Sequence, residues 1–76
     1  MEGLDRQLRY FVCIAESGSL SRAADALDQT QSGLSKQLAM LETTIGQPLF
    51  HRTGRGVQLT EAGKLLYEGV QPAYRA

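Results

Sequence analysis

Residues 19–45 read SLSRAADALDQTQSGLSKQLAMLETTI, and this stretch decides the fold. In its first part, apolar residues from Leu20 to Leu27 recur at the i, i+3, i+4 and i+7 spacing of one helix face. In its second part, leucines at 34, 38 and 41 with Ile45 form a similar face. Ser19 and Thr30 stand just before these two patterns, where a hydroxyl caps a helix. We therefore predict two capped helices joined by a short turn.

The turn between the two helices is only about three residues long, which makes the helices cross steeply. Two adjacent alanines, Ala23 and Ala24, provide small side chains where the helices must approach closely. This arrangement is a helix-turn-helix, the motif that many DNA-binding domains use. An ordinary corner between helices in another kind of helical domain is the alternative, and this stretch alone leaves both open.

Composition sets further limits. A chain of 76 residues, 42% of them hydrophobic, is enough for one small domain. Its N-terminus lacks the basic and then apolar pattern of a secretory signal, and no apolar run approaches membrane-spanning length. A single cysteine cannot form an internal disulfide, which fits a reducing compartment. We therefore expect a cytoplasmic protein that is not in a membrane.

The net charge is zero, with eight basic and eight acidic residues, whereas nucleic-acid binding favours a basic balance. The charges are unevenly distributed, however. Between residues 30 and 60 the basic residues Lys36, Arg52 and Arg55 face only one acidic residue, Glu42. The local balance is therefore compatible with a DNA-binding surface.

A first helix is predicted over residues 4–17 and packs across the other two as the third member of a three-helix core. Its apolar face is formed by Leu4, Leu8, Phe11, Val12 and Ala15, with Ile14 on the flank. Arg6, Gln7, Arg9 and Glu16 are expected to face water. Gly18 suits the position just past the end of the helix, where φ is often positive.

Gly46 and Pro48 are expected to end the second helix of the motif. Two short strands follow, at residues 50–52 and 57–59, around a glycine-containing tip at 53–56. On the first strand Phe50 and Arg52 should point to one side and His51 to the other. A hairpin directly after a helix-turn-helix is a wing.

The last segment shows one apolar stripe on a helix that Thr60 can cap and that Glu61 begins. The stripe consists of Ala62, Leu65, Leu66, Gly69, Val70 and Ala73. Such a terminal helix either folds back on the domain or pairs with its copy in a second subunit. We favour pairing, because the three-helix core can be closed without this helix.

Taken together, these segments resemble the N-terminal winged helix-turn-helix domain of LysR-type transcriptional regulators. The resemblance covers almost the whole chain. Its motifs are LRYF at 8–11, GSL at 18–20, AA at 23–24 with Leu27, QS at 31–32, LSKQL at 34–38, LE at 41–42, GQPLF at 46–50 with Arg52, and LTEAG at 59–63. The chain departs from the family pattern at Asp28 and Gln29, at Gly33 and at His51.

The resemblance implies a mainly α fold: a winged helix-turn-helix with a three-helix core and a two-stranded wing over residues 1–59, and a linker or dimerisation helix over 60–76. It implies a bacterial, cytoplasmic homodimer that binds double-stranded promoter DNA sequence-specifically and regulates transcription. In this family a C-terminal effector-binding domain normally follows. We therefore expect the chain to be the DNA-binding part of a longer protein, whose small-molecule effector acts only through that further domain.

The second helix of the motif is the expected recognition helix. With a turn of about 100° per residue, Ser32 and Lys36 lie opposite Leu34, and Ser35 lies on the flank. The first residues of such a helix reach base edges in the major groove. Gln31 is the best base reader by chemistry, because its amide suits adenine, although its computed angle lies nearer the core flank. Ser32, Ser35 and Lys36 are expected to contact bases or phosphates.

Further DNA contacts are expected at the helix start and in the wing. Thr30 and the backbone N–H groups behind it can hold a phosphate, and Gly33 would allow the backbone to approach the DNA closely. In the wing, Arg55 at the tip suits the minor groove or a phosphate, while Arg52 and the hydroxyls of Thr53 and Thr60 suit phosphates. Three assignments keep alternatives: Gln31 or Lys36 as solvated surface residues, and Arg52 paired with an acidic neighbour.

An enzyme is not expected. The chain has one histidine, His51, and one cysteine, Cys13, and the sequence shows no catalytic pair, metal cluster or phosphate-binding loop. We therefore predict no catalytic residue, no metal and no cofactor. The remaining alternative is a winged helix that serves protein–protein interaction without binding DNA, which the neutral net charge would suit.

Overall fold

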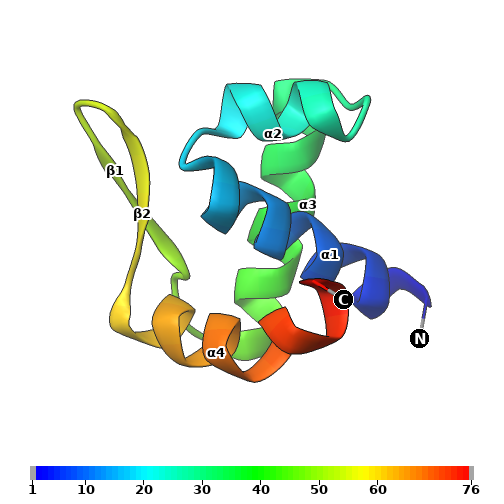
Figure 1. Ribbon diagram of the computed structural model, residues 1–76, viewed down its shortest axis with the longest axis vertical. Coiled ribbons are helices and arrows are strands. Elements are labelled where there is room, and N and C mark those ends of the chain that lie inside the picture. The colour runs from blue at the N-terminus through cyan, green and yellow to red at the C-terminus, as the bar shows by residue number, and fades with distance from the viewer. Residues whose placement is uncertain (1, 76) are drawn as a thin grey trace.

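The computed structural model describes residues 2–75, and the side chains of residues 3–70. Helices α1 (Glu2–Ser17), α2 (Leu20–Ala26) and α3 (Gln31–Ile45) precede the strands β1 (Phe50–Thr53) and β2 (Gly56–Leu59) and the helix α4 (Glu61–Arg75). Figure 1 shows the hairpin standing beside the helices, with α4 at the end opposite the hairpin tip. The predicted order of three helices, a wing and a final helix is confirmed.

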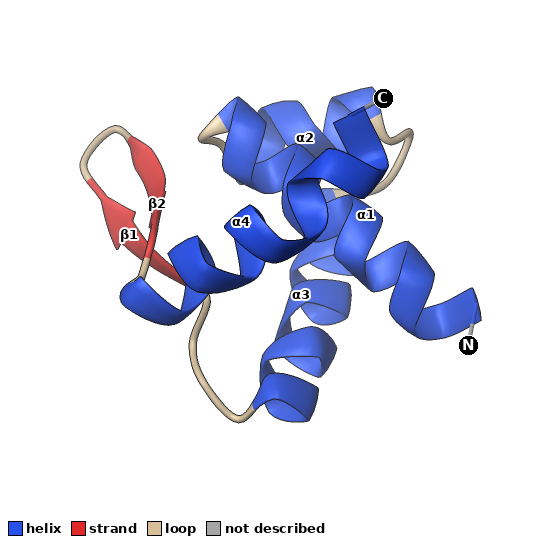
Figure 2. Ribbon diagram, turned by 60° about the horizontal axis from the view of Figure 1, so that its bottom comes forward, coloured by secondary structure: helices blue, strands red, loops and turns tan. Residues whose placement is uncertain are grey.

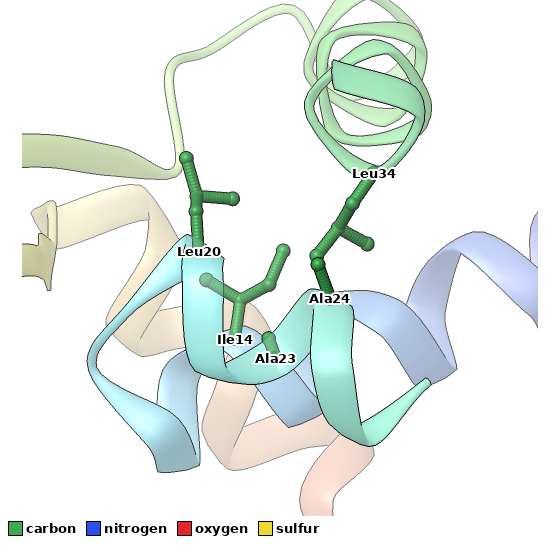
Figure 3. Close-up of a cluster of buried hydrophobic side chains, with 5 residues drawn as sticks. All are labelled: Ile14, Leu20, Ala23, Ala24 and Leu34. Atoms are coloured by element: carbon green, nitrogen blue, oxygen red, sulfur yellow. The ribbon is translucent and has the colours of Figure 1, made fainter. Parts of the chain in front are cut away.

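The helix-turn-helix is held together by a first cluster of buried side chains, which consists of Ile14, Leu20, Ala23, Ala24 and Leu34. Figure 3 shows these side chains converging from α1, α2 and α3. Ala23 and Leu34 are fully buried, so the small alanine side chains do let α2 lie close to its neighbours. The predicted reason for the paired alanines is thereby confirmed.

Local chemistry sets the ends of these helices as predicted. The Ser19 hydroxyl accepts a hydrogen bond from the Arg22 N–H at 3.2 Å and caps α2. Gly18 and Gly46 adopt left-handed conformations, with φ of 69° and 83°, just past the ends of α1 and α3. In the turn before α3, Asp28 has a φ of 57°, a region that aspartate tolerates better than most residues.

A second cluster lies beneath α4 and consists of Phe11, Val12, Leu41 and Leu49. The ring of Phe50 packs against that of Phe11, with centroids 5.4 Å apart and planes tilted by 49°. Leu66, Tyr67 and Val70 of α4 cover this cluster. Figure 2 shows α4 lying across α1 on this side of the molecule. The second cluster therefore joins the helix-turn-helix to both the wing and the last helix.

Three predictions about the core are wrong in detail. Gln7, expected in water, is buried, and Ile14, expected on the flank of α1, is fully buried. The reason is that α1 packs against α2, α3 and α4 together, so more than one stripe of this helix is covered. Conversely, Ile45 is 41% exposed, because it is the last residue of α3 and extends beyond the packed core.

The strands are one residue longer at the tip than expected. Thr53 pairs with Gly56 in the antiparallel ladder, which leaves Gly54 and Arg55 as the turn. The hairpin is attached to the helices through Leu49, whose N–H donates to the Glu42 carboxylate at 2.7 Å. These contacts fix the strand β1 against the end of α3.

Thr60 secures the start of α4. Its hydroxyl donates to the Pro48 carbonyl at 2.7 Å and accepts from the Gly63 N–H at 3.0 Å. The Thr60 N–H donates to the Leu49 carbonyl at 3.0 Å. Gly63 lies so close to this carbonyl that a side chain at 63 would overlap it. The first turn of α4 is therefore bound to the segment between α3 and β1.

The apolar stripe of α4 is divided between two environments. Ala62, Leu66 and Val70 pack on the second cluster, so this part of the stripe folds back on its own domain. The expectation that the core closes without α4 is wrong to that extent, because α4 covers side chains that α1 and α3 leave bare. Leu65 points outward and is 67% exposed. Ala73 lies outside the side chains that the structure describes.

Candidate nucleic-acid interface

The exposure of the side chains on α3 agrees with the helix faces that the sequence predicts. Ser32 and Lys36 are exposed, and Ser35 is half-buried on the flank. On the opposite side, Leu34 and Leu41 are fully buried. The leucine face therefore holds α3 on the domain, while the N-terminal half of the helix offers short polar groups and one ammonium group to the solvent.

The start of α3 has a capped N-terminus that faces the solvent. Thr30 is the cap, and its hydroxyl accepts from the Gly33 N–H at 3.0 Å. The first N–H groups of a helix lack partners within the helix and carry its positive dipole end. Gln31, predicted nearer the core flank, is exposed at this end. Thr30 and Gln31 are therefore both accessible to the solvent at the first turn of α3.

Gly33 is half-buried, and a contact within the protein gives a reason for glycine at this position. A Cβ at this position would lie 2.8 Å from the Thr30 Oγ1 atom. A side chain there would therefore press on the capping hydroxyl. The predicted close approach to DNA stays a prediction beside this local explanation.

The hairpin places its two arginines differently. Arg55 lies in the turn and is exposed, as predicted. Arg52 is exposed on the same side of β1 as Phe50, and both line a cleft between the hairpin and α3. Within residues 3–70, Arg52 forms no ion pair, so the alternative of an acidic partner is not realised there.

Thr53 has a structural task in the hairpin. Its hydroxyl accepts from the Arg55 N–H at 3.2 Å and donates weakly to the Gly56 carbonyl at 3.4 Å. The Thr60 hydroxyl is likewise engaged on both sides. A phosphate would have to compete with these internal bonds, so neither threonine is as available as its sequence position suggests.

The cleft between α3 and the hairpin has a volume of about 170 Å³. Ser35, Ala39 and Glu42 line it from α3, and Phe50, Arg52 and Val57 line it from the hairpin, with Leu20 and Leu38 completing the wall. From the sequence, Glu42 is an opposing charge and part of the LE motif at 41–42, without a predicted structural role. A carboxylate one turn before the end of a helix that is followed by a glycine–proline turn is a signal for the bond that Glu42 makes to the Leu49 N–H.

The candidate residues gather toward one end of the molecule. In Figure 1 the start of α3 and the hairpin tip both point upward, away from α4. Within the described residues, no group of three or more histidine, cysteine or acidic side chains is arranged to hold a metal ion. No helix in that part of the chain is long and apolar enough to span a bilayer. This end carries the exposed Lys36 and Arg55, and the exposed Asp25 and Asp28 lie before the start of α3.

Comparison with known sequences gives a consistent result. Residues 5–64 match the bacterial regulatory helix-turn-helix proteins of the lysR family. The HTH-type transcriptional regulator BudR of Klebsiella aerogenes is 52% identical over 63 residues, which cover 83% of this chain and 44% of BudR. The regulator DgdR of Burkholderia cepacia is 53% identical over 68 residues, which cover 90% of this chain and 23% of DgdR. The chain thus spans less than half the length of these two relatives.

Solved structures show the same fold. The chain aligns with the DNA-binding domain in the crystal structure of the CbnR_DBD–DNA complex with a TM-score of 0.82 and 37% sequence identity. The alignment covers 90% of this chain and 78% of that one. BudR and DgdR are both named as transcriptional regulators and not as enzymes, as the sequence predicted for this chain.

Proposed function

Because the chain belongs to the lysR family of bacterial regulatory helix-turn-helix proteins, we propose that it binds promoter DNA sequence-specifically as a homodimer. In this proposal α3 enters the major groove, and the hairpin lies on the minor groove or the phosphate backbone. The relatives are longer than this chain, so we further propose that it belongs to a cytoplasmic regulator of transcription. A small-molecule effector would act through the part of that regulator outside this chain.

The observation that carries the proposal is the polar face of α3. Leu34 and Leu41 are fully buried while Ser32 and Lys36 are exposed, so the helix is anchored along one side only. A helix mounted in this way fits the major groove, which is wide enough to admit one α-helix. The CbnR domain, with the same fold, has been crystallised with DNA.

The roles of the α3 residues follow from their chemistry. Gln31, exposed at the helix start, can bond the N6 and N7 atoms of adenine with its amide. Ser32, Ser35 and Lys36 follow on the exposed side and its flank, where they reach either a base edge or a phosphate. Thr30 and the first N–H groups of α3 bind a phosphate at the end of the helix. These contacts would supply sequence choice and register together.

In the hairpin, Arg55 reaches the minor groove or a phosphate beyond the groove that α3 occupies. Arg52 has no ion-pair partner among the described side chains, and it lines the cleft beside Ser35. A DNA phosphate at the edge of this cleft would be neutralised by the Arg52 guanidinium, while the Glu42 carboxylate in the same cleft accepts from the Leu49 N–H. Thr53 supports Arg55 through the hydrogen bond that its hydroxyl accepts from the Arg55 N–H.

The homodimer would form through α4. Leu65 is 67% exposed on a helix whose neighbouring apolar residues already cover the core. A single exposed leucine is common on protein surfaces, so the support for pairing comes from its position on the helix that the family resemblance assigns to the dimer contact. In Figure 1, α4 lies at the end opposite the hairpin tip, so a partner at α4 would leave the DNA-facing end free.

DNA binding is tested by fluorescence anisotropy with labelled duplexes over a series of salt concentrations. A duplex enriched from a random-sequence pool is compared with one of scrambled sequence. The proposal predicts steep salt dependence on both and tighter binding to the enriched duplex. A protein-interaction module, the reading that the zero net charge would favour, would show neither behaviour.

A further inference from the structure

The hairpin touches the helical body through a close backbone contact at Gly56. The next residue, Val57, donates its N–H to the Gly18 carbonyl at 3.1 Å. Gly56 itself has a φ of 139°, and a Cβ at this position would overlap the same carbonyl oxygen. The obstructing atom is backbone and cannot rotate away as a side chain can. Residue 56 must therefore be glycine for the hairpin to lie where it does.

The contact at Gly56 affects the position of Arg55, the residue that precedes Gly56. The Thr53 hydroxyl bonds both the Arg55 N–H and the Gly56 carbonyl, so the tip is tied together around Gly56. The ribbon itself is short, with four residues in each strand. Because an isolated two-stranded ribbon is only marginally stable, its direction is set by what it packs against. Below the tip, the hairpin is held in place by Phe50 and Val57, which pack on the first cluster, and by the hydrogen bond from the Val57 N–H to the Gly18 carbonyl.

We propose that Gly56 is the positioning residue of the hairpin, and that it aims Arg55 at the DNA by allowing β2 to seat against the Gly18 carbonyl. Gly56 itself touches no DNA in this scheme. The proposal rests on the proposed function, in which Arg55 contacts the minor groove or a phosphate. It adds that a contact between the loop after α1 and the wing determines whether that arginine reaches its target.

The chain provides a matched control in the same turn. Gly54 precedes Arg55 as Gly56 follows it, but a Cβ at Gly54 would meet nothing within 4 Å, and its φ is not positive. Gly54→Ala and Gly56→Ala thus add the same methyl group on either side of Arg55. Only the second forces the hairpin away from Gly18.

The test is a double-mutant cycle in which binding to a labelled duplex of mixed sequence is measured by anisotropy over a salt series. In the wild type, Arg55→Ala should weaken binding about fivefold and flatten the salt slope by about one unit. In the Gly56→Ala background, Arg55→Ala should cause little further change in either quantity. In the Gly54→Ala background, it should keep its full effect. A residue that matters only for stability would not remove the Arg55 part of the salt slope.

The proposal is overturned if Arg55→Ala has the same effect on affinity and slope in the Gly56→Ala background as in the wild type. If Arg55→Ala changes nothing in the wild type, the wing contact of the proposed function is refuted and the positioning role falls with it. These two results are distinct, because the first leaves the Arg55 contact intact.

If Gly56→Ala fails to fold, a synthetic chain with an ester in place of the Val57 amide serves instead. The ester removes the N–H that reaches the Gly18 carbonyl and adds no side chain. A smaller effect of Arg55→Ala in the ester chain supports the proposal, and an undiminished effect overturns it.

Discussion

Thr60→Val should destabilise the domain more than the substitution of an exposed threonine normally does. The substitution keeps the shape of the side chain and removes the hydroxyl, which donates to the Pro48 carbonyl at 2.7 Å and caps α4 through the Gly63 N–H at 3.0 Å. Loss of a helix cap costs about 1 kcal/mol, and loss of the second bond about another 1 kcal/mol. The expected decrease in the free energy of unfolding is therefore about 2 kcal/mol.

For a domain of this size, 1 kcal/mol corresponds to a change in Tm of roughly 4–8 °C, so Tm should fall by roughly 8–16 °C. The measurement is thermal and urea unfolding followed by the helical circular dichroism signal, at one protein concentration for all variants. A single concentration is needed because dimer formation would itself raise the apparent stability.

Thr44→Val is the matched control. The Thr44 hydroxyl donates to the Met40 carbonyl at 3.1 Å, within an exposed part of α3. Such a bond to the preceding turn adds little to helix stability, so this variant should stay within about 0.5 kcal/mol of the wild type. If Thr60→Val is no more destabilising than Thr44→Val, then the hydroxyl does not bind α4 to the segment before β1, and our account of that junction is wrong.

Three further predictions concern DNA binding and assembly. Gln31→Ala should cost roughly 1–3 kcal/mol on the enriched duplex and much less on scrambled DNA, and equal losses on both would refute base reading by Gln31. Arg55→Ala should weaken binding to both duplexes alike and flatten the salt slope by about one unit, whereas a loss confined to the enriched sequence would indicate base recognition. Leu65→Asp should leave the thermal stability of the monomer unchanged, since Leu65 is 67% exposed. It should weaken self-association, measured by sedimentation, roughly hundredfold or more, because each copy contributes one leucine to the dimer contact. Unchanged sedimentation would exclude this surface from the dimer.

Much of the fold could be predicted from the sequence because it depends on residues that are close together in the chain. Ser19 and Thr30 cap α2 and α3 as predicted, and Gly46 ends α3 in a left-handed conformation. The periodicity of α3 correctly separated the buried Leu34 from the exposed Lys36. Caps and helix faces are decided within one or two turns, so a local pattern is sufficient evidence for them.

The predicted DNA-contact residues also divide into those whose exposure follows from the local pattern and those whose surroundings depend on tertiary contacts. The pattern placed Ser32 and Lys36 on the solvent side because only the helix period was needed. It could not show that the Thr53 hydroxyl is engaged inside the hairpin, since that depends on how the turn closes. Nor could it show that Arg52 lacks an acidic partner among the described side chains, since that depends on where Glu42 lies across the cleft.

The sequence by itself determined the order of elements, their caps and the outward face of α3, because each of these follows from residues close together in the chain. Only the tertiary structure decided that Gln7 is buried, that part of α4 covers the second cluster, and that Gly56 seats against Gly18. These features join segments far apart in the sequence. Which surfaces meet is fixed by packing all four helices and the hairpin at once, and no single stretch carries that information.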